Sequence, residues 1–128
     1  MNEITFEGKV FAGEGTGRKY LSFSWVQQQI KENLGFTPFL GTLNLKLNQE
    51  GAFRRKKLEK LDSLKICPPE GYCVGLLFKA YIGNNACAVI IPQVRGYPKN
   101  VLEIIASTNL RASLGLSDED SVAVRVQA

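Results

Sequence analysis

A hydroxyl and an amide lie two residues apart near the middle of the chain, at Thr42 and Asn44 in the stretch "GTLN". Apolar and polar residues alternate over residues 43–47, which predicts a strand buried on one face. Residues two apart on a strand lie on the same face, so both oxygens would point the same way. Mg²⁺ prefers such oxygen ligands. The alternative is an ordinary polar face on an edge strand.

The segment "GEGTGR", residues 13–18, has three glycines within five residues and is predicted to be a loop. Backbone N–H groups in such a loop can approach phosphate oxygens, and Arg18 would add positive charge. The segment lacks the GK[ST] ending of a P-loop, which excludes a Walker-type nucleotide site. Phosphate binding and a plain glycine-rich hairpin both stay open from these residues alone.

A carboxylate and a candidate anion site follow near the C-terminus. Glu103 lies within an apolar stretch that predicts a strand, so it either faces solvent or is held in a pocket suited to proton transfer. Residues 107–111, "STNLR", offer hydroxyl, amide and guanidinium groups at a predicted helix start. Arg111 could equally form an ordinary surface ion pair.

The composition excludes several kinds of chemistry. The chain has no histidine, which rules out Ser-His-Asp and Cys-His nucleophilic sites. Its three cysteines have no CxxC spacing, which argues against structural zinc. The 128 residues predict one domain over 1–128. Because no apolar run approaches the roughly 18 residues of a membrane span and no signal-peptide pattern is present, we expect a cytoplasmic protein without a membrane partner.

The net charge of +4 comes largely from "RRKKLEK", residues 54–60. Such a run is usually a solvated face, although it could attract an anionic ligand or nucleic acid. The rest of the chain lacks the aromatic and basic interleaving of single-strand binders. We expect no nucleic-acid partner and keep a nucleic-acid-binding barrel as an alternative.

Periodicity predicts mostly strands. We expect strands over residues 4–13, 20–23, 43–47, 100–107 and 121–128, and a strand pair over 71–92. Residues 24–35 predict the main helix, with Ser24 and Gln27 as a capping box, Gly35 as its end, and a buried stripe of Trp25, Val26, Ile30 and Leu34. Residues 50–65 are either irregular or a short helix, and 107–116 predict one or two helical turns. These elements favour a small, mostly antiparallel barrel of about six strands.

Three blocks, residues 8–22, 34–47 and 90–120, together resemble the archaeal CTP-dependent riboflavin kinase family, over nearly the whole chain. The "GTLN" stretch and "LEIIA" followed by "LR" are the most specific parts of the match. The resemblance implies a mostly β fold, a six-stranded cradle-loop barrel. It also implies transfer of the γ-phosphate of CTP to the 5′-hydroxyl of riboflavin, giving FMN and CDP. We expect a monomer that uses Mg²⁺.

The resemblance also implies roles for individual residues. Thr42 and Asn44 would bind Mg²⁺, and Glu103 would contact the flavin. From its position in the strand we further hypothesise that Glu103 orients or deprotonates the flavin 5′-hydroxyl. The nucleotide would be bound by two segments, Gly13, Glu14, Gly15, Thr16, Gly17 and Arg18 in the first and Thr108, Asn109, Leu110, Arg111, Ala112 and Ser113 in the second.

The chain departs from the family pattern at two places. Val94 and Arg95 stand where the family usually has Arg-Thr, so Arg95 would hold the flavin phosphate by charge rather than through a hydroxyl. The "DGD" turn of the family is Asp118-Glu119-Asp120 here. The first departure keeps a second interpretation open, a non-catalytic barrel that binds flavin or nucleotide.

Overall fold

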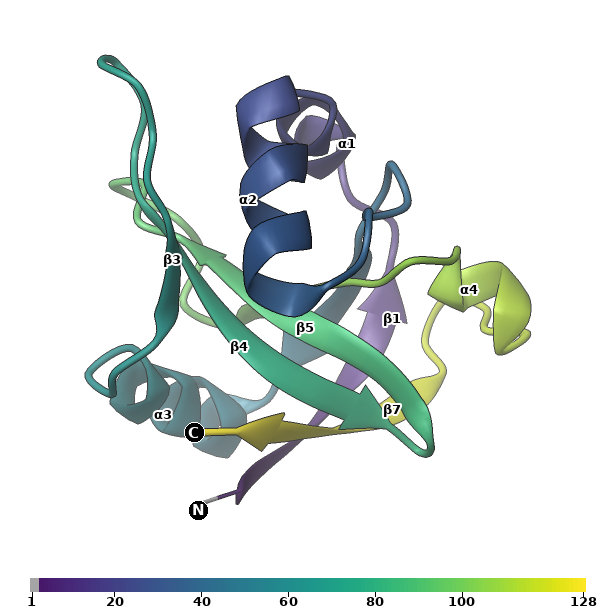
Figure 1. The fold of residues 1–128 in the computed structure, drawn as a ribbon. Helices are drawn as coiled ribbons and strands as arrows, with labels where there is room; N and C mark the ends of the chain where they lie inside the picture. The colour runs from purple at the N-terminus through teal and green to yellow at the C-terminus, as the bar shows by residue number, and fades with distance from the viewer. Residues whose placement is uncertain (1–2) are drawn as a thin grey trace.

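The computed structural model describes residues 3–128 and shows a closed barrel of six antiparallel strands with helices around it (Figure 1). The strands follow in the order β4-β5-β6-β2-β1-β7, and pairing between β4 and β7 closes the ring. A short seventh strand, β3 (Leu64–Ile66), is added to β4. The predicted mostly β barrel is confirmed. The barrel strands are β1 (Glu3–Phe11), β2 (Leu43–Leu47), β4 (Gly75–Ile82), β5 (Asn85–Pro92), β6 (Val101–Ile105) and β7 (Ser121–Gln127).

Four helices pack outside the ring: α1 (Thr16–Leu21), α2 (Ser24–Leu34), α3 (Gln49–Leu58) and α4 (Leu110–Ser113). In Figure 1, α1 and α2 lie above the barrel, α3 lies below it and α4 lies to the right. None of these helices has both the length and the apolar character that crossing a bilayer requires, within the residues described.

The strand predicted over residues 20–23 is wrong, because Tyr20 and Leu21 end helix α1. A returning strand would need a free edge of β1, but β1 already pairs with β7 on one side and β2 on the other. The chain therefore leaves β1, turns at Gly15 and becomes helical at Thr16, inside the segment predicted to be a loop. This turn buries Leu21 against the outside of the barrel.

Helix α2 is confirmed, but its N-cap residue differs from the predicted one. Phe23 is the N-cap residue and no side chain caps the helix, so the predicted capping box does not form. Gln27 instead donates a hydrogen bond from Nε2 to the Leu21 carbonyl, 3.0 Å away. Gly35 ends the helix at φ 81°, as predicted. Of the predicted stripe, Val26 and Ile30 are fully buried, while Trp25 and Leu34 are partly buried.

The segment left open over residues 50–65 forms helix α3 and strand β3. The Asn48 side chain accepts a hydrogen bond from the Gly51 N–H, 2.8 Å away, and so caps the start of α3. The helix packs against β1 and β2. Arg55 lies within the predicted solvated run yet is buried, so this part of the prediction is wrong.

The barrel wall separates two apolar clusters. The larger cluster fills the interior and includes Leu43, Leu45 and Leu47 of β2. The smaller cluster lies between α2 and the outer face of the wall, and includes Ile90 and Ile105. Burial of each such side chain stabilises the fold by about 1.5–3 kcal/mol. Asn44 alternates with the interior leucines and therefore points to the outer face, the side on which the smaller cluster lies.

Candidate functional site

The residues that could do chemistry meet on the outer face of the barrel. Asn44 of β2 is the antiparallel partner of Glu103 on β6 and of Phe11 on β1. Partners directly opposite in an antiparallel pair share a face, so the Asn44 and Glu103 side chains point the same way. Asn44 is 9% exposed although it faces outward. Something outside the barrel must therefore cover it.

The glycine-rich segment is that cover. A Cβ at Gly13 would overlap the Asn44 Nδ2 atom, and a Cβ at Gly17 would lie 3.0 Å from Thr42 Oγ1. Only residues without a side chain allow the backbone to pass this close. The predicted glycine loop and the predicted metal pair, about 30 residues apart in sequence, therefore form one structural unit.

Thr42 and Asn44 form a compact oxygen pair. Thr42 Oγ1 donates a hydrogen bond to Asn44 Oδ1, 2.9 Å away, which confirms that the two side chains share a face. A hydroxyl oxygen and an amide oxygen are hard ligands of the kind that Mg²⁺ accepts alongside water and phosphate oxygens. Glu14 and Glu103 line the same cavity and add carboxylate charge. The donor set thus fits a hard divalent cation.

A largely apolar cavity of about 530 Å³ opens beside this pair, and we call it the apolar cavity. Its wall comes from β1, α1, β5 and the segment before β6, with Thr42, Asn44 and Glu103 at its polar end. Its volume suits a drug-sized or cofactor-sized ligand. The apolar wall is formed mainly by Phe11, Tyr20, Leu21, Ile90, Pro92, Val94, Tyr97, Pro98 and Val101.

Glu103 lies at the boundary between polar and apolar surroundings. Burial raises the pKa of its carboxyl, and the Tyr97 hydroxyl and the Arg55 charge oppose this in part. A carboxylate with a raised pKa is a stronger base than one in water. Of the two interpretations left open by the sequence, the structure supports the pocket rather than the solvent-facing position.

Two smaller cavities continue from the apolar cavity. The loop cavity, about 280 Å³, is lined by residues 13–18 together with Gly41, Thr42, Asn44 and Glu103. The α4 cavity, about 210 Å³, lies between Arg18, Phe39 and the start of α4. Thr42 lines all three cavities. A ligand group in each could therefore reach the same hydroxyl.

The predicted nucleotide segments divide between these cavities. All six residues from 13 to 18 line the loop cavity. Residues 108–111 line the α4 cavity, whereas Ala112 and Ser113 line none of these three cavities. Asn109 caps α4 by accepting a hydrogen bond from the Ala112 N–H at 3.1 Å. Arg111 also pairs with Asp118 at 2.7 Å, the surface ion pair that the sequence left open.

Arg95 is exposed on the turn between β5 and β6. It lines neither the apolar cavity nor the loop and α4 cavities, although its neighbour Val94, 51% exposed, lines the apolar cavity. Sequence reasoning gave no site role to Tyr20 or Tyr97. Only the packing of α1 and of this turn brings the two rings to the same wall.

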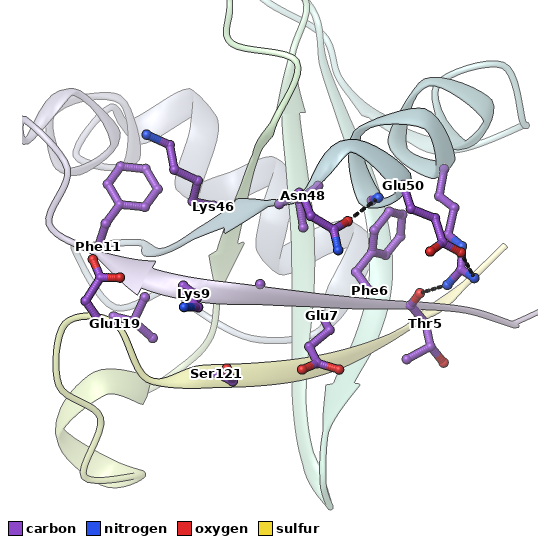
Figure 2. A pocket seen from close by; sticks show the side chains of 15 residues that line it. Thr5, Phe6, Glu7, Lys9, Phe11, Lys46, Asn48, Glu50, Glu119 and Ser121 are labelled. Carbon is purple, nitrogen blue, oxygen red and sulfur yellow. Dashed lines mark hydrogen bonds and ion pairs between the residues drawn. The ribbon is translucent and has the colours of Figure 1, made fainter.

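A separate groove of about 590 Å³ runs along the outside of β1, between α3 and the turn before β7 (Figure 2). Figure 2 shows the Asn48 cap at the start of α3, and Glu50, whose carboxylate accepts a hydrogen bond from Arg54 at 2.8 Å. The groove contains none of the residues predicted for the metal, nucleotide or flavin site. Its charged residues balance, with Lys9, Lys46 and Arg54 against Glu7, Glu50 and Glu119, so it has no net charge to attract an anion.

The basic run does not form a continuous cationic surface. Arg54 is paired with Glu50 and also donates to the Thr5 carbonyl at 2.9 Å. Arg55 is buried, and the Lys57 ammonium lies over the Phe53 ring at 4.7 Å. Arg54 and Arg55 are therefore held by contacts within the protein, and Lys56, Lys57 and Lys60 are the exposed lysines of the run.

The chain matches a known family over most of its length. The family model CTP-dep_RFKase, with the description "Domain of unknown function DUF120", matches residues 10–126. The chain is 37% identical to the riboflavin kinase of Archaeoglobus fulgidus, covering 96% of this chain and 54% of that protein. It is 39% identical to that of Pyrobaculum aerophilum, covering 96% and 60%. For the riboflavin kinase of Ignicoccus hospitalis the identity is 36%, covering 96% and 71%. The chain thus spans little more than half the length of the first of these relatives.

Proposed function

We propose that this chain, which belongs to the CTP-dependent riboflavin kinase family, transfers the γ-phosphate of CTP to the 5′-hydroxyl of riboflavin, giving FMN and CDP. One observation carries the proposal. A cavity large enough for a flavin ring ends at Thr42, Asn44 and Glu103, where it meets a loop of backbone amides suited to phosphates. A phosphate donor and a hydroxyl acceptor could meet at that junction.

The apolar cavity would hold the isoalloxazine ring and direct the ribityl chain to its polar end. The aromatic rings of Tyr20 and Tyr97 line that cavity and offer surfaces for the flavin. The 5′-hydroxyl would then lie beside Glu103. As the oxygen–phosphorus bond forms, the hydroxyl proton passes to the Glu103 carboxylate, while the bond to the β-phosphate oxygen breaks and CDP leaves.

The loop cavity would hold the triphosphate. The backbone N–H groups of residues 13–18 and the Arg18 guanidinium would neutralise phosphate charge as it develops. Mg²⁺, held by Thr42 and Asn44, would supply further charge neutralisation on the phosphate oxygens. Phosphoryl transfer depends mainly on positioning and electrostatics, so the absence of histidine from the sequence is no obstacle.

The cytosine and ribose would occupy the α4 cavity, with Phe39 and residues 108–111 around them. The cavity is small, about 210 Å³, and shares Thr42 with the apolar cavity. A small base fits this space better than a large one, which favours a pyrimidine donor over ATP.

The test is a riboflavin phosphorylation assay with Mg²⁺, run in parallel with CTP and ATP, in which FMN is separated and quantified. We expect FMN with CTP and little with ATP. Equal rates with both nucleotides would contradict CTP as the specific donor but would still support the proposed kinase activity. The Thr42→Ala and Asn44→Ala double variant serves as the inactive control.

A non-catalytic flavin-binding barrel is the second candidate. It is favoured by Arg95, which stands at the altered family position and lines none of the described cavities. Riboflavin binding without FMN formation under any nucleotide would support it against the kinase.

A further inference from the structure

Helix α3 buries a charged side chain that lies outside the three site cavities. Arg55 is 1% exposed and is among the largest fully buried side chains of the described chain. Its nearest carboxylate oxygen is Glu59 Oε1, 3.5 Å from Nη1, and its Nε has no hydrogen-bond partner. A guanidinium held this way costs stability that an apolar side chain of similar size would not. Packing alone therefore does not explain an arginine here.

The guanidinium lies against one aromatic ring. Arg55 Cζ is 5.4 Å from the centroid of Tyr97, a cation–π distance. Burial lowers the pKa of Arg55, while the negative charges of nearby groups, Glu59 first, act in the opposite direction. Arginine keeps its charge in such surroundings, so the Tyr97 ring faces a permanent cation.

Tyr97 connects this cation to the apolar cavity. It lines the cavity together with Glu103, whereas Arg55 lines neither the apolar cavity nor the loop and α4 cavities. The Tyr97 hydroxyl is buried beside the Glu103 carboxyl, and the ring belongs to the turn before β6 rather than to a strand. No strand ladder holds the ring, and its polar contacts are with Glu103 through the hydroxyl and with Arg55 across the ring face.

We propose that Arg55 is a positioning residue for flavin binding: from helix α3 it holds the Tyr97 ring in place as a wall of the apolar cavity. The identity of the ligand rests on the proposed function. The guanidinium does not touch the flavin. It fixes the ring on which the flavin packs, so its loss weakens flavin binding and leaves nucleotide binding unchanged.

The test compares Arg55→Met and Arg55→Lys with Lys56→Met, a charge removal at the exposed next residue of the same helix. The riboflavin Kd is measured by flavin fluorescence, and the KM is measured for riboflavin and for CTP. We expect Arg55→Met to raise the riboflavin Kd and KM about tenfold. Arg55→Lys should give a smaller rise, Lys56→Met none, and the KM for CTP should not change.

A double-mutant cycle separates positioning from a structural role. In a Tyr97→Leu background, Arg55→Met should change the riboflavin Kd less than about twofold, because the ring it restrains is gone. An equal effect in both backgrounds, or a folded Arg55→Met with wild-type Kd, would overturn the proposal. If Arg55→Met does not fold, the same cycle is run with Arg55→Lys.

The outcomes also distinguish this proposal from the kinase itself. Riboflavin binding without FMN formation would overturn the proposed kinase activity, and the double-mutant cycle on the riboflavin Kd would still decide the role of Arg55. If the protein forms FMN but Arg55→Met changes the riboflavin Kd equally with and without Tyr97, only the positioning role would be overturned. A wild-type protein that binds no riboflavin would overturn both.

Discussion

Asn44 and Glu103 are direct antiparallel partners on β2 and β6, and both project from the outer face of a barrel whose interior is apolar. Thr42 joins them through its 2.9 Å hydrogen bond to Asn44 Oδ1. The register of two strands therefore places a carboxylate beside a pair of neutral oxygen ligands.

Loss of the Thr42 hydroxyl should weaken metal-dependent turnover. We expect Thr42→Ala to raise the Mg²⁺ concentration for half-maximal FMN formation by about 10- to 100-fold, because one oxygen ligand is lost and Asn44 loses its hydrogen-bond partner. Thr42→Ser keeps the hydroxyl and is the matched control. An unchanged Mg²⁺ dependence in Thr42→Ala would contradict the metal role.

A methyl group at Gly13 should impair catalysis more than a methyl group at Gly71. Alanine at Gly13 would overlap Asn44 Nδ2 and displace it, at a cost of about 1–3 kcal/mol. Gly71, at φ 93° with open space around it, tests backbone strain alone in a distant loop. Turnover and thermal unfolding of both variants are measured. Equal effects on turnover would show that close approach to Asn44 is unimportant.

Glu103→Gln should separate chemistry from binding. We expect kcat to fall about 10²- to 10⁴-fold, as for loss of a general base, while the riboflavin Kd changes little. Thr42→Ala is the comparison. If Glu103→Gln turns over normally while Thr42→Ala does not, the base role fails and the metal role stands.

Glu103→Gln should also change how the stability of the protein without Mg²⁺ depends on pH. Burial raises the pKa of folded Glu103, so the carboxyl favours folding when it is protonated. That contribution is present below the unfolded-state pKa of about 4.3 and is lost as pH rises through the folded-state pKa. Glu103→Gln stays neutral, so it should raise the free energy of unfolding at pH 7 relative to wild type and not at pH 4. Urea titrations at both pH values test this.

The three cysteines should react at different rates with a thiol reagent. Cys67 and Cys73 are exposed, whereas Cys87 is buried in β5, and its burial raises its pKa to about 12. Since the thiolate is the reactive form, Cys87 stays unreactive at pH 8. We expect two thiols to react in the folded protein and the third only in denaturant. Rapid reaction of all three would contradict the burial of Cys87.

Local patterns explain which parts of the fold the sequence predicted. Strand β2 and the shared face of Thr42 and Asn44 follow from a two-residue period, which needs no knowledge of other strands. The helix over residues 16–21 could not be predicted in this way. Its sequence fits a strand as well, and only the occupied edges of β1 exclude that.

The polar residues of the candidate site, Thr42, Asn44 and Glu103, could be predicted because their residue types indicate their chemistry. The apolar wall was not, because Tyr20 and Tyr97 come from a helix and a turn whose positions depend on tertiary packing. Arg55 was missed for the opposite reason. It lies in a run of basic residues that look alike in the sequence. Only the orientation of α3 against the barrel decides that Arg55 is buried while Lys56 and Lys57 stay exposed.

Because residues alternate between two faces along β2, substitutions in this one strand should have two different effects, loss of stability or loss of activity. Leu43, Leu45 and Leu47 face the interior, while Asn44 faces outward beside Gly13 and Glu103. Random mutagenesis of this strand should therefore produce phenotypes that alternate with residue parity. Odd positions would give thermolabile protein that still works when cold, and position 44 would give well-folded protein that is inert at every temperature.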